Sequence, residues 1–241
     1  MTATSFRPVR VSAMHEAQVA LGATFRDDGD WRVADVYSTP SDEVQRALVA
    51  VGLADASAGG KLQVRGEAVD ALLAKVAAIE RIGAGTAARL RLNGAEVLVC
   101  RLAPDELLVL TDVTDVVAVA DGLRKAAEAV GCAHVTDLTS GLAAVDLLGP
   151  DVLRLLAAVV PLDLSPDLVR PLAIVQGELA RARAILVRLD RPRVPAFRAL
   201  VAREHGAFVW DTLLHVGRPL GLVPVGAAAR AALDEAPWRE R

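Results

Sequence analysis

A β-strand that ends at a glycine and leads directly into a helix is predicted twice in this 241-residue chain. The first copy covers residues 60–79, where polar and apolar side chains alternate before Gly66. The second covers residues 142–160, where Gly149 separates an apolar strand from a helix. Two copies of one pattern indicate an internal duplication of an α+β unit.

Hairpins are expected to connect most of the remaining strands. Asn93-Gly94 joins two alternating segments at 87–92 and 95–102, and this dipeptide is the strongest short-range signal for a two-residue hairpin turn. Further strands are predicted at 106–111, 133–138, 141–148, 178–188 and 196–202. Strands that pair through hairpins, with helices grouped together, favour an α+β fold rather than a doubly wound parallel sheet.

Capping residues indicate where the helices begin. Thr39 is expected to cap a helix that has Pro40 at its first position, and the acidic residues Asp42 and Glu43 suit the N-terminal end of the helix dipole. We expect this helix to run to about residue 51 and to end at Gly52. Further helices are predicted at about 67–79, 113–130, 149–160 and 205–216.

These elements divide the chain into three parts. Residues 1–35 are mixed and turn-rich and are expected to form an N-terminal extension. Residues 36–132 are predicted to form a first α+β unit and residues 133–241 a second. We expect the units to make one body, with the strands at 61–66 and 142–148 in equivalent places about an internal pseudo-twofold axis.

Composition limits the function classes. Hydrophobic residues make up 53% of the chain, enough for a buried core. The net charge of −3 predicts no electrostatic attraction to nucleic acid or to an anionic membrane. The start of the chain lacks the apolar region of a signal peptide, and no apolar run is long enough to span a bilayer, so we expect a cytoplasmic protein. The two cysteines, Cys100 and Cys132, and the four histidines have no metal-ligand spacing, so no metal site is expected.

Four segments, in order along the chain, carry a family resemblance. They read Met14-His15-Glu16-Ala17-Gln18, Asp55-Ala56-Ser57-Ala58-Gly59-Gly60-Lys61, Val135-Thr136-Asp137-Leu138-Thr139-Ser140-Gly141 and Gly217-Arg218-Pro219-Leu220-Gly221-Leu222-Val223-Pro224-Val225-Gly226. Together they resemble the folate-binding superfamily of the glycine-cleavage T-protein and the heterotetrameric sarcosine oxidases. The resemblance implies two related α+β units ringed around a central folate pocket. Because the chain ends soon after Gly226, we do not expect the C-terminal barrel domain of the T-protein.

The same resemblance suggests candidate site residues. Glu96 aligns with a family acid and would be the catalytic residue that stabilises a developing iminium; a solvent-facing place on a hairpin is the alternative. Arg188 and Phe197 match the family's later loop and would contact the cofactor. Arg198 stands where the family has a Glu that pairs with the N–H groups of the pterin. A carboxylate only accepts hydrogen bonds and an Arg only donates them, so each lost charged bond costs on the order of 1.5–3 kcal/mol.

The loop that leads to Arg198 departs from the family in other ways. Arg193 and Ala196 replace two glycines, and Pro192 and Pro195 fix φ where the family loop is free. Its basic residues would suit the glutamate tail of folate or an acidic partner, and a solvated loop is the alternative. Arg188 would bind that tail or a carboxylate substrate, or would be a surface residue at a strand end.

Two functions remain after these comparisons with the family pattern. The first is an accessory or structural subunit, similar to the sarcosine oxidase γ-subunit, in a folate-linked amine oxidase or demethylase system. Its partner would be a flavin amine oxidase-type subunit or a second copy, and its own tetrahydrofolate site would be degenerate. The second is an active tetrahydrofolate-dependent aminomethyltransferase or demethylase of the T-protein type. The altered loop favours the first function. It predicts weak or absent tetrahydrofolate binding that Arg198→Glu would improve.

Overall fold

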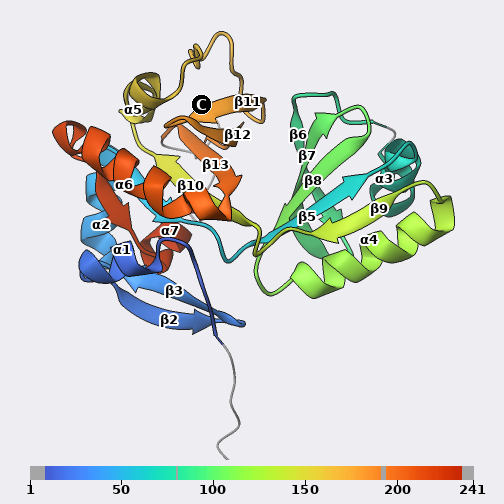
Figure 1. Cartoon of the computed structure of the whole chain (residues 1–241), viewed down its shortest axis with the longest axis horizontal. Coiled ribbons are helices and arrows are strands. Elements are labelled where there is room, and N and C mark those ends of the chain that lie inside the picture. The colour runs from blue at the N-terminus through green and yellow to red at the C-terminus, as the bar shows by residue number, and fades with distance from the viewer. Residues whose placement is uncertain (1–8, 80, 191–193, 235–241) are drawn as a thin grey trace, which may run out of the picture.

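The computed structural model describes residues 9–79, 81–190 and 194–234, and these form three sheets (Figure 1). The N-terminal part contributes β1 (Arg10–Val11), α1 (His15–Ala20), β2 (Thr24–Asp28) and β3 (Trp31–Val36). Its strands form a small sheet in the order β1-β3-β2, with Gly29 at a φ of 61° in the turn between β2 and β3. The stretch expected to be an extension therefore contains a sheet of its own.

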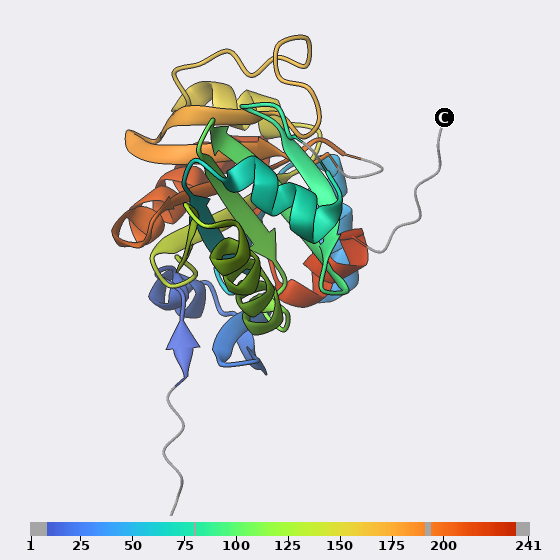
Figure 2. The same ribbon diagram turned by 90° about the vertical axis from the view of Figure 1, so that its right-hand side faces the viewer.

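The second sheet has five strands and is covered by two helices on its outer face. Its strands are β5 (Gly60–Arg65), β6 (Ala87–Leu92), β7 (Ala95–Ala103), β8 (Glu106–Thr111) and β9 (His134–Asp137), in the order β6-β7-β8-β5-β9. The covering helices are α3 (Val69–Ala77) and α4 (Val116–Val130), which lie in front of the sheet in Figure 2. Their apolar faces bury Leu72 and Leu73 of α3 and Leu123 of α4 against the sheet.

The third sheet has six strands. They are β4 (Gly52–Asp55), β10 (Leu142–Leu148), β11 (Ile174–Leu179), β12 (Ala182–Arg188), β13 (Ala196–Ala202) and β14 (Val223–Val225), in the order β11-β12-β13-β10-β4-β14. Helices α5 (Val152–Val159) and α6 (Gly206–Gly217) pack on its outer face around Leu155, Phe197 and Trp210. Helices α2 (Pro40–Val49) and α7 (Ala227–Asp234) pack beside β4 and β14, and Figure 1 shows them between this sheet and the N-terminal one.

Apart from β14, the two larger sheets have the same strand order, and they exchange one strand each. Strands β5 and β10 take the same place in their sheets. Each has one neighbour from its own half of the chain, β8 for β5 and β13 for β10, and one neighbour from the other half. Strand β4 precedes β5 in the chain but pairs with β10, and β9 precedes β10 but pairs with β5. The topology therefore agrees with the expected equivalence of β5 and β10. Each sheet contains a strand from the other side of the expected boundary between residues 132 and 133. The division of the chain into two domains at that boundary stays a prediction.

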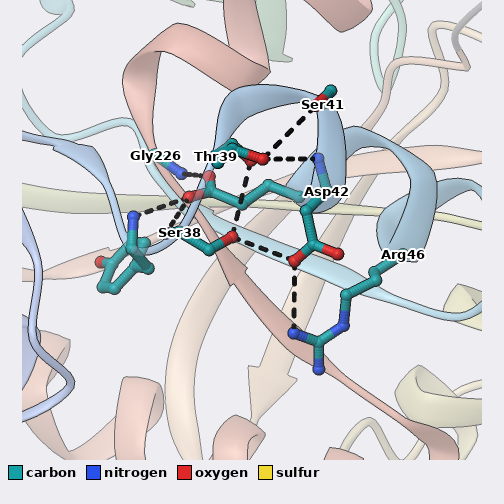
Figure 3. Close-up of polar contacts among 8 residues, drawn as sticks. Ser38, Thr39, Ser41, Asp42, Arg46 and Gly226 are labelled. Atoms are coloured by element: carbon teal, nitrogen blue, oxygen red, sulfur yellow. Dashed lines mark hydrogen bonds and ion pairs between the residues drawn. The ribbon is translucent and has the colours of Figure 1, made fainter.

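The first long helix shows which capping signals are local. The Thr39 side chain accepts a hydrogen bond from the Asp42 backbone N–H at 3.3 Å, and Pro40 lies in the first turn, as predicted (Figure 3). The expected end of this helix at Gly52 is wrong. The helix ends at Val49, and Gly52 begins β4, where an added Cβ would lie 2.9 Å from the side chains of Ala47 and Val225.

Glu43 joins α2 to two distant parts of the chain. Glu43 is 2% exposed. One oxygen of its carboxylate accepts hydrogen bonds from the backbone N–H groups of Tyr37 at 2.6 Å and Ser38 at 2.8 Å. The second oxygen accepts from Gly226 N at 2.7 Å, a contact drawn in Figure 3. An acidic residue expected only to suit the helix dipole thus fixes the end of β3 and the start of α7 on α2.

One predicted strand is in fact a hairpin. Residues 178–188 do not form a single strand, because Ala180 and Arg181 make a two-residue turn between β11 and β12 with φ of 51° and 67°. The Asn93-Gly94 turn, with φ of 52° and 86°, has the same form and is confirmed. Asn and Gly tolerate this conformation and signal it, whereas Ala and Arg adopt it only because both strands are held in the sheet. None of the helices described is long and apolar enough to cross a membrane.

Candidate functional site

The inner faces of the two large sheets pack against each other. Strand β7 contributes Leu98 and Cys100, strand β8 contributes Leu108 and Leu110, and the opposite sheet contributes a matching apolar set. That set is Ala144, Ile174, Val187, Leu189 and Leu200. At the edge, Ala87 N donates to Leu172 O at 2.7 Å and Ile174 N donates to Gly85 O at 2.8 Å. The sheets therefore enclose a buried apolar cluster made of their own side chains.

Arg198 lies on this inner face and forms an ion pair with Asp146. The two residues are cross-strand partners on β13 and β10. Arg198 Nε donates to Asp146 Oδ1 at 2.7 Å, and Nη2 donates to Oδ2 at 2.8 Å. Arg230 of α7 approaches the same Oδ2 at 3.6 Å. The Asp146 side chain is 4% exposed and that of Arg198 is 22% exposed, so the carboxylate of this bidentate pair is shielded from water.

The electrostatics of the inner face follow from this pair. Burial alone would lower the pKa of Arg198, but the charge and hydrogen bonds of Asp146 outweigh burial and raise it above its ordinary value. Burial raises the pKa of the Cys100 thiol to about 12, and the nearby charge of Arg198 only partly offsets this rise. At neutral pH the thiol is therefore protonated and the guanidinium charged, so neither acts as a base or a nucleophile.

Arg188 and Phe197 lie together on the opposite, helix-covered face of the sheet. They are cross-strand partners, and the Arg188 guanidinium carbon is 5.9 Å from the centre of the Phe197 ring. Arg188 Nε donates to both oxygens of Asp190, at 2.9 and 3.0 Å, and Nη1 donates to the Val169 carbonyl. Because side chains alternate along a strand, Phe197 and Arg198 point to opposite faces. The structure thus brings Arg188 and Phe197 together and separates both from Arg198.

Glu96 lies near the turn of the β6–β7 hairpin. It shares a strand face with Leu98 and Cys100, but its side chain is 81% exposed. Its carboxylate accepts from the exposed Arg91 at 3.4 Å. This exposure and this ion pair match the solvent-facing position on a hairpin that was the alternative to a catalytic role for Glu96.

The chain crosses between the sheets beside the inner face, and Lys61 lies at this crossing. Its amino group donates to the carbonyls of Ser57 and Gly59 at 2.7 Å each and to that of Thr139 at 3.3 Å. Lys61 is 2% exposed, and burial lowers its pKa from 10.5 to about 7, assisted by the charge of Arg198.

The sequence interpretation missed Asp146 and Lys61 as members of the site. Asp146 has a signal, since it is the only charged residue in the apolar strand from Leu142 to Leu148, and a charge inside a buried strand requires a partner. The partner, Arg198, is 52 residues away and has no local signal. The alternation predicted before Gly66 puts Lys61 at a polar position of its strand, whereas its side chain is buried in the structure. The loop residues Arg191, Pro192 and Arg193 lie outside the described residues.

Comparisons with known proteins give one family match and relatives of two kinds. The family model described as "GCVT N-terminal domain" matches residues 14–234. An aminomethyltransferase from Saccharopolyspora erythraea is 28% identical over 232 residues, which cover 93% of this chain and 62% of the relative. A sarcosine oxidase subunit alpha from Corynebacterium sp. (strain U-96) is 26% identical over 242 residues, which cover 91% of this chain and 25% of that subunit. The chain thus spans about three-fifths of the length of the aminomethyltransferases that it matches.

Solved structures show the same fold. The glycine cleavage system aminomethyltransferase T from Bartonella henselae superposes with a TM-score of 0.82 at 19% identity, over 94% of this chain and 62% of that one. A chain of the heterotetrameric sarcosine oxidase from Corynebacterium sp. U-96, solved with pyrrole 2-carboxylate, gives a TM-score of 0.62 at 22% identity. That match covers 78% of this chain and 98% of the sarcosine oxidase chain. At these identities the likeness establishes the fold and leaves the chemistry to the site.

Proposed function

Because this chain belongs to the GCVT N-terminal domain family, we propose that it keeps the fold of that family but has lost the tetrahydrofolate site. In this proposal it is a cytoplasmic accessory or structural subunit of a folate-linked amine oxidase or demethylase system in one-carbon metabolism. The chemistry would then be carried out by a partner chain.

The Asp146–Arg198 ion pair is the observation that carries this proposal. The family resemblance puts at position 198 a carboxylate that accepts hydrogen bonds from the pterin. Here that position holds a residue that only donates, and both oxygens of the nearby Asp146 already accept from it. The residues present do not fit the hydrogen-bonding edge of a pterin.

The other candidate cofactor residues support the same conclusion. Arg188 is occupied by Asp190 and a backbone carbonyl, and it lies with Phe197 on the face that α5 and α6 cover. The inner face is filled by side chains such as Cys100, Val187 and Leu200, each at most 1% exposed. A cofactor between the sheets would have to displace this packing.

A subunit role fits the comparison with sarcosine oxidase. One chain of that heterotetramer is covered almost completely by this fold, so a body of this kind works there as one subunit of an oligomer. The partner that we propose is a flavin amine oxidase-type subunit, or a second copy of this chain. Exposed large apolar side chains, including Val49, Val117 and Phe208, lie on separate helices and do not by themselves mark one interface. The surface that would bind such a partner is therefore part of this proposal.

The alternative is an active tetrahydrofolate-dependent aminomethyltransferase or demethylase. Its support is that the relatives named aminomethyltransferase match almost the whole of this chain. In that case Glu96 would be the acid nearest to the substrate amine, and its exposed carboxylate would have to be enclosed when substrate binds.

Calorimetric titration with tetrahydrofolate separates the two functions. We expect no saturable binding tighter than a Kd of about 100 μM. A thermal unfolding scan of the same sample confirms that the protein is folded. A Kd of about 1 μM or below would overturn the degenerate-site proposal and favour the transferase. The accessory-subunit proposal also predicts that affinity purification of the tagged chain from its native host recovers a flavoprotein in constant ratio.

A further inference from the structure

The exchanged strands leave each sheet incomplete without the other half of the chain. Strand β4 pairs antiparallel with β10, with Asp55 opposite Val145. Strand β9 pairs antiparallel with β5, with Asp137 opposite Leu62. If either half were removed, β5 or β10 would present an open edge of unpaired N–H and C=O groups.

Two crossing loops, residues 56–59 between β4 and β5 and residues 138–141 between β9 and β10, are fixed by matching hydrogen bonds. Ser57 Oγ accepts from Ala144 N at 3.0 Å, and Thr139 Oγ1 accepts from Lys61 N at 3.1 Å. Next to them, the N–H of Ala56 donates to Ala144 O at 2.9 Å, and that of Leu138 donates to Lys61 O at 2.8 Å. Ser57 and Thr139 are at most 2% exposed, so water does not compete for these bonds.

The Lys61 side chain adds a link that has no counterpart. Its symmetry equivalent, Ala144, has no polar side chain. The Lys61 amino group bonds to carbonyls of both crossing loops, Ser57 and Gly59 in one and Thr139 in the other. Removing it would leave buried carbonyls without a donor on both sides of the crossing.

We infer that the two halves of this chain, on either side of Gly131, are partners joined by strand exchange and by the Lys61 amino group, and stay bound when the backbone between them is cut. The surface that each half offers is an open sheet edge, and the partner is the extended strand of the other half. The inference holds whether or not the chain is an accessory subunit.

Cleavage of the folded chain tests this inference directly. A specific protease site inserted between Gly131 and Cys132 lies in an exposed connection, and an added Cβ at Gly131 would meet open space. After cleavage under native conditions we expect both halves to elute together in size-exclusion chromatography, with a Kd below about 1 μM. Separate elution of two species would overturn the inference.

Substitutions then test the crossing. Lys61→Met should raise the Kd of the cut halves by about tenfold or more, because a buried hydrogen-bonding group is lost. Lys75→Met, at an exposed lysine on α3, is the matched control and should leave the Kd unchanged. An unchanged Kd for Lys61→Met would exclude the role assigned to its amino group.

A second measurement covers the case in which the inserted site prevents folding. Native-state hydrogen exchange on the unmodified chain should give the amides of β5 and β10 one common opening free energy, since neither sheet opens alone. Two distinct opening free energies for these strands would contradict the inference.

Discussion

Arg101 and Arg188 occupy the same place in the two large sheets. Arg101 exchanges backbone hydrogen bonds with the segment before β6, accepting from Gly85 N at 2.9 Å. Arg188 does the same before β11, accepting from Leu172 N at 2.9 Å. Both side chains are buried, at 2% and 8% exposure, and each guanidinium binds one aspartate and at least one backbone carbonyl.

This equivalence predicts that Arg188 stabilises the fold in the same way as Arg101. Arg188→Ala and Arg101→Ala should each lower the free energy of unfolding by about 2 kcal/mol, because each leaves a backbone carbonyl and a partly exposed aspartate without the buried guanidinium that donates to them. Urea unfolding measures the loss, with the exposed Arg183→Ala as control. If Arg188→Ala kept full stability, its assignment to a ligand site would regain support.

The ion pair of Arg198 changes the outcome expected for Arg198→Glu. The sequence alone predicts that this variant improves tetrahydrofolate binding. In the structure it would place a second carboxylate opposite Asp146, so the single variant should lose about 3 kcal/mol of stability and gain no affinity. The double variant Asp146→Asn/Arg198→Glu removes the repulsion and should bind tetrahydrofolate better than the unmodified protein. Calorimetry on both variants decides, and tighter binding by the single variant would show that Asp146 does not limit the site.

Lys61 predicts a pH dependence of stability. Burial, together with the charges of Arg198 and Arg203, lowers its pKa from 10.5 to about 7, while Asp55 and Asp137 act in the opposite direction. Between these two pH values the unfolded chain keeps the proton and the folded chain releases it. The contribution of this group to stability therefore increases as the pH rises from about 7 towards 10.5, and it is least favourable below pH 7.

Unfolding by urea at a series of pH values checks this dependence. Lys61→Met should remove the part of the slope above pH 7, whereas the exposed Lys75→Met should keep it. A slope identical in all three proteins would mean that Lys61 keeps its ordinary pKa.

Two glycines after the equivalent strands should be intolerant of substitution to the same degree. Gly66 has a φ of +143°, and an added Cβ would lie 2.0 Å from the Cys132 carbonyl oxygen. Gly149 has a φ of +125°, and its Cβ would lie 2.3 Å from the Ala50 carbonyl oxygen. Alanine at either position should cost about 3 kcal/mol or more. Gly22→Ala, with a φ of +80° and open space around it, isolates the backbone strain and should cost about 1 kcal/mol in the same thermal unfolding assay.

Local signals in the sequence determined most of the elements. Thr39 with Pro40 predicts the start of α2, and Asn93-Gly94 predicts the turn between β6 and β7, because a few neighbouring residues decide each conformation. The repeated strand–glycine–helix pattern likewise predicts two similar units. The same reasoning was wrong to predict one continuous strand at 178–188, since the turn at Ala180-Arg181 is imposed by the sheet on residues that do not favour it.

The candidate site was decided only by tertiary structure. Arg188, Phe197 and Arg198 are close in sequence, yet the alternation of side chains along β12 and β13 places the first two on one face and the third on the other. Asp146 reaches Arg198 because β10 and β13 are neighbours in the sheet, across 52 residues of chain. The exchange of β4 and β9 has the same origin. Pairing between strands depends on which sheet edges meet in space, and no local pattern in either strand encodes that choice.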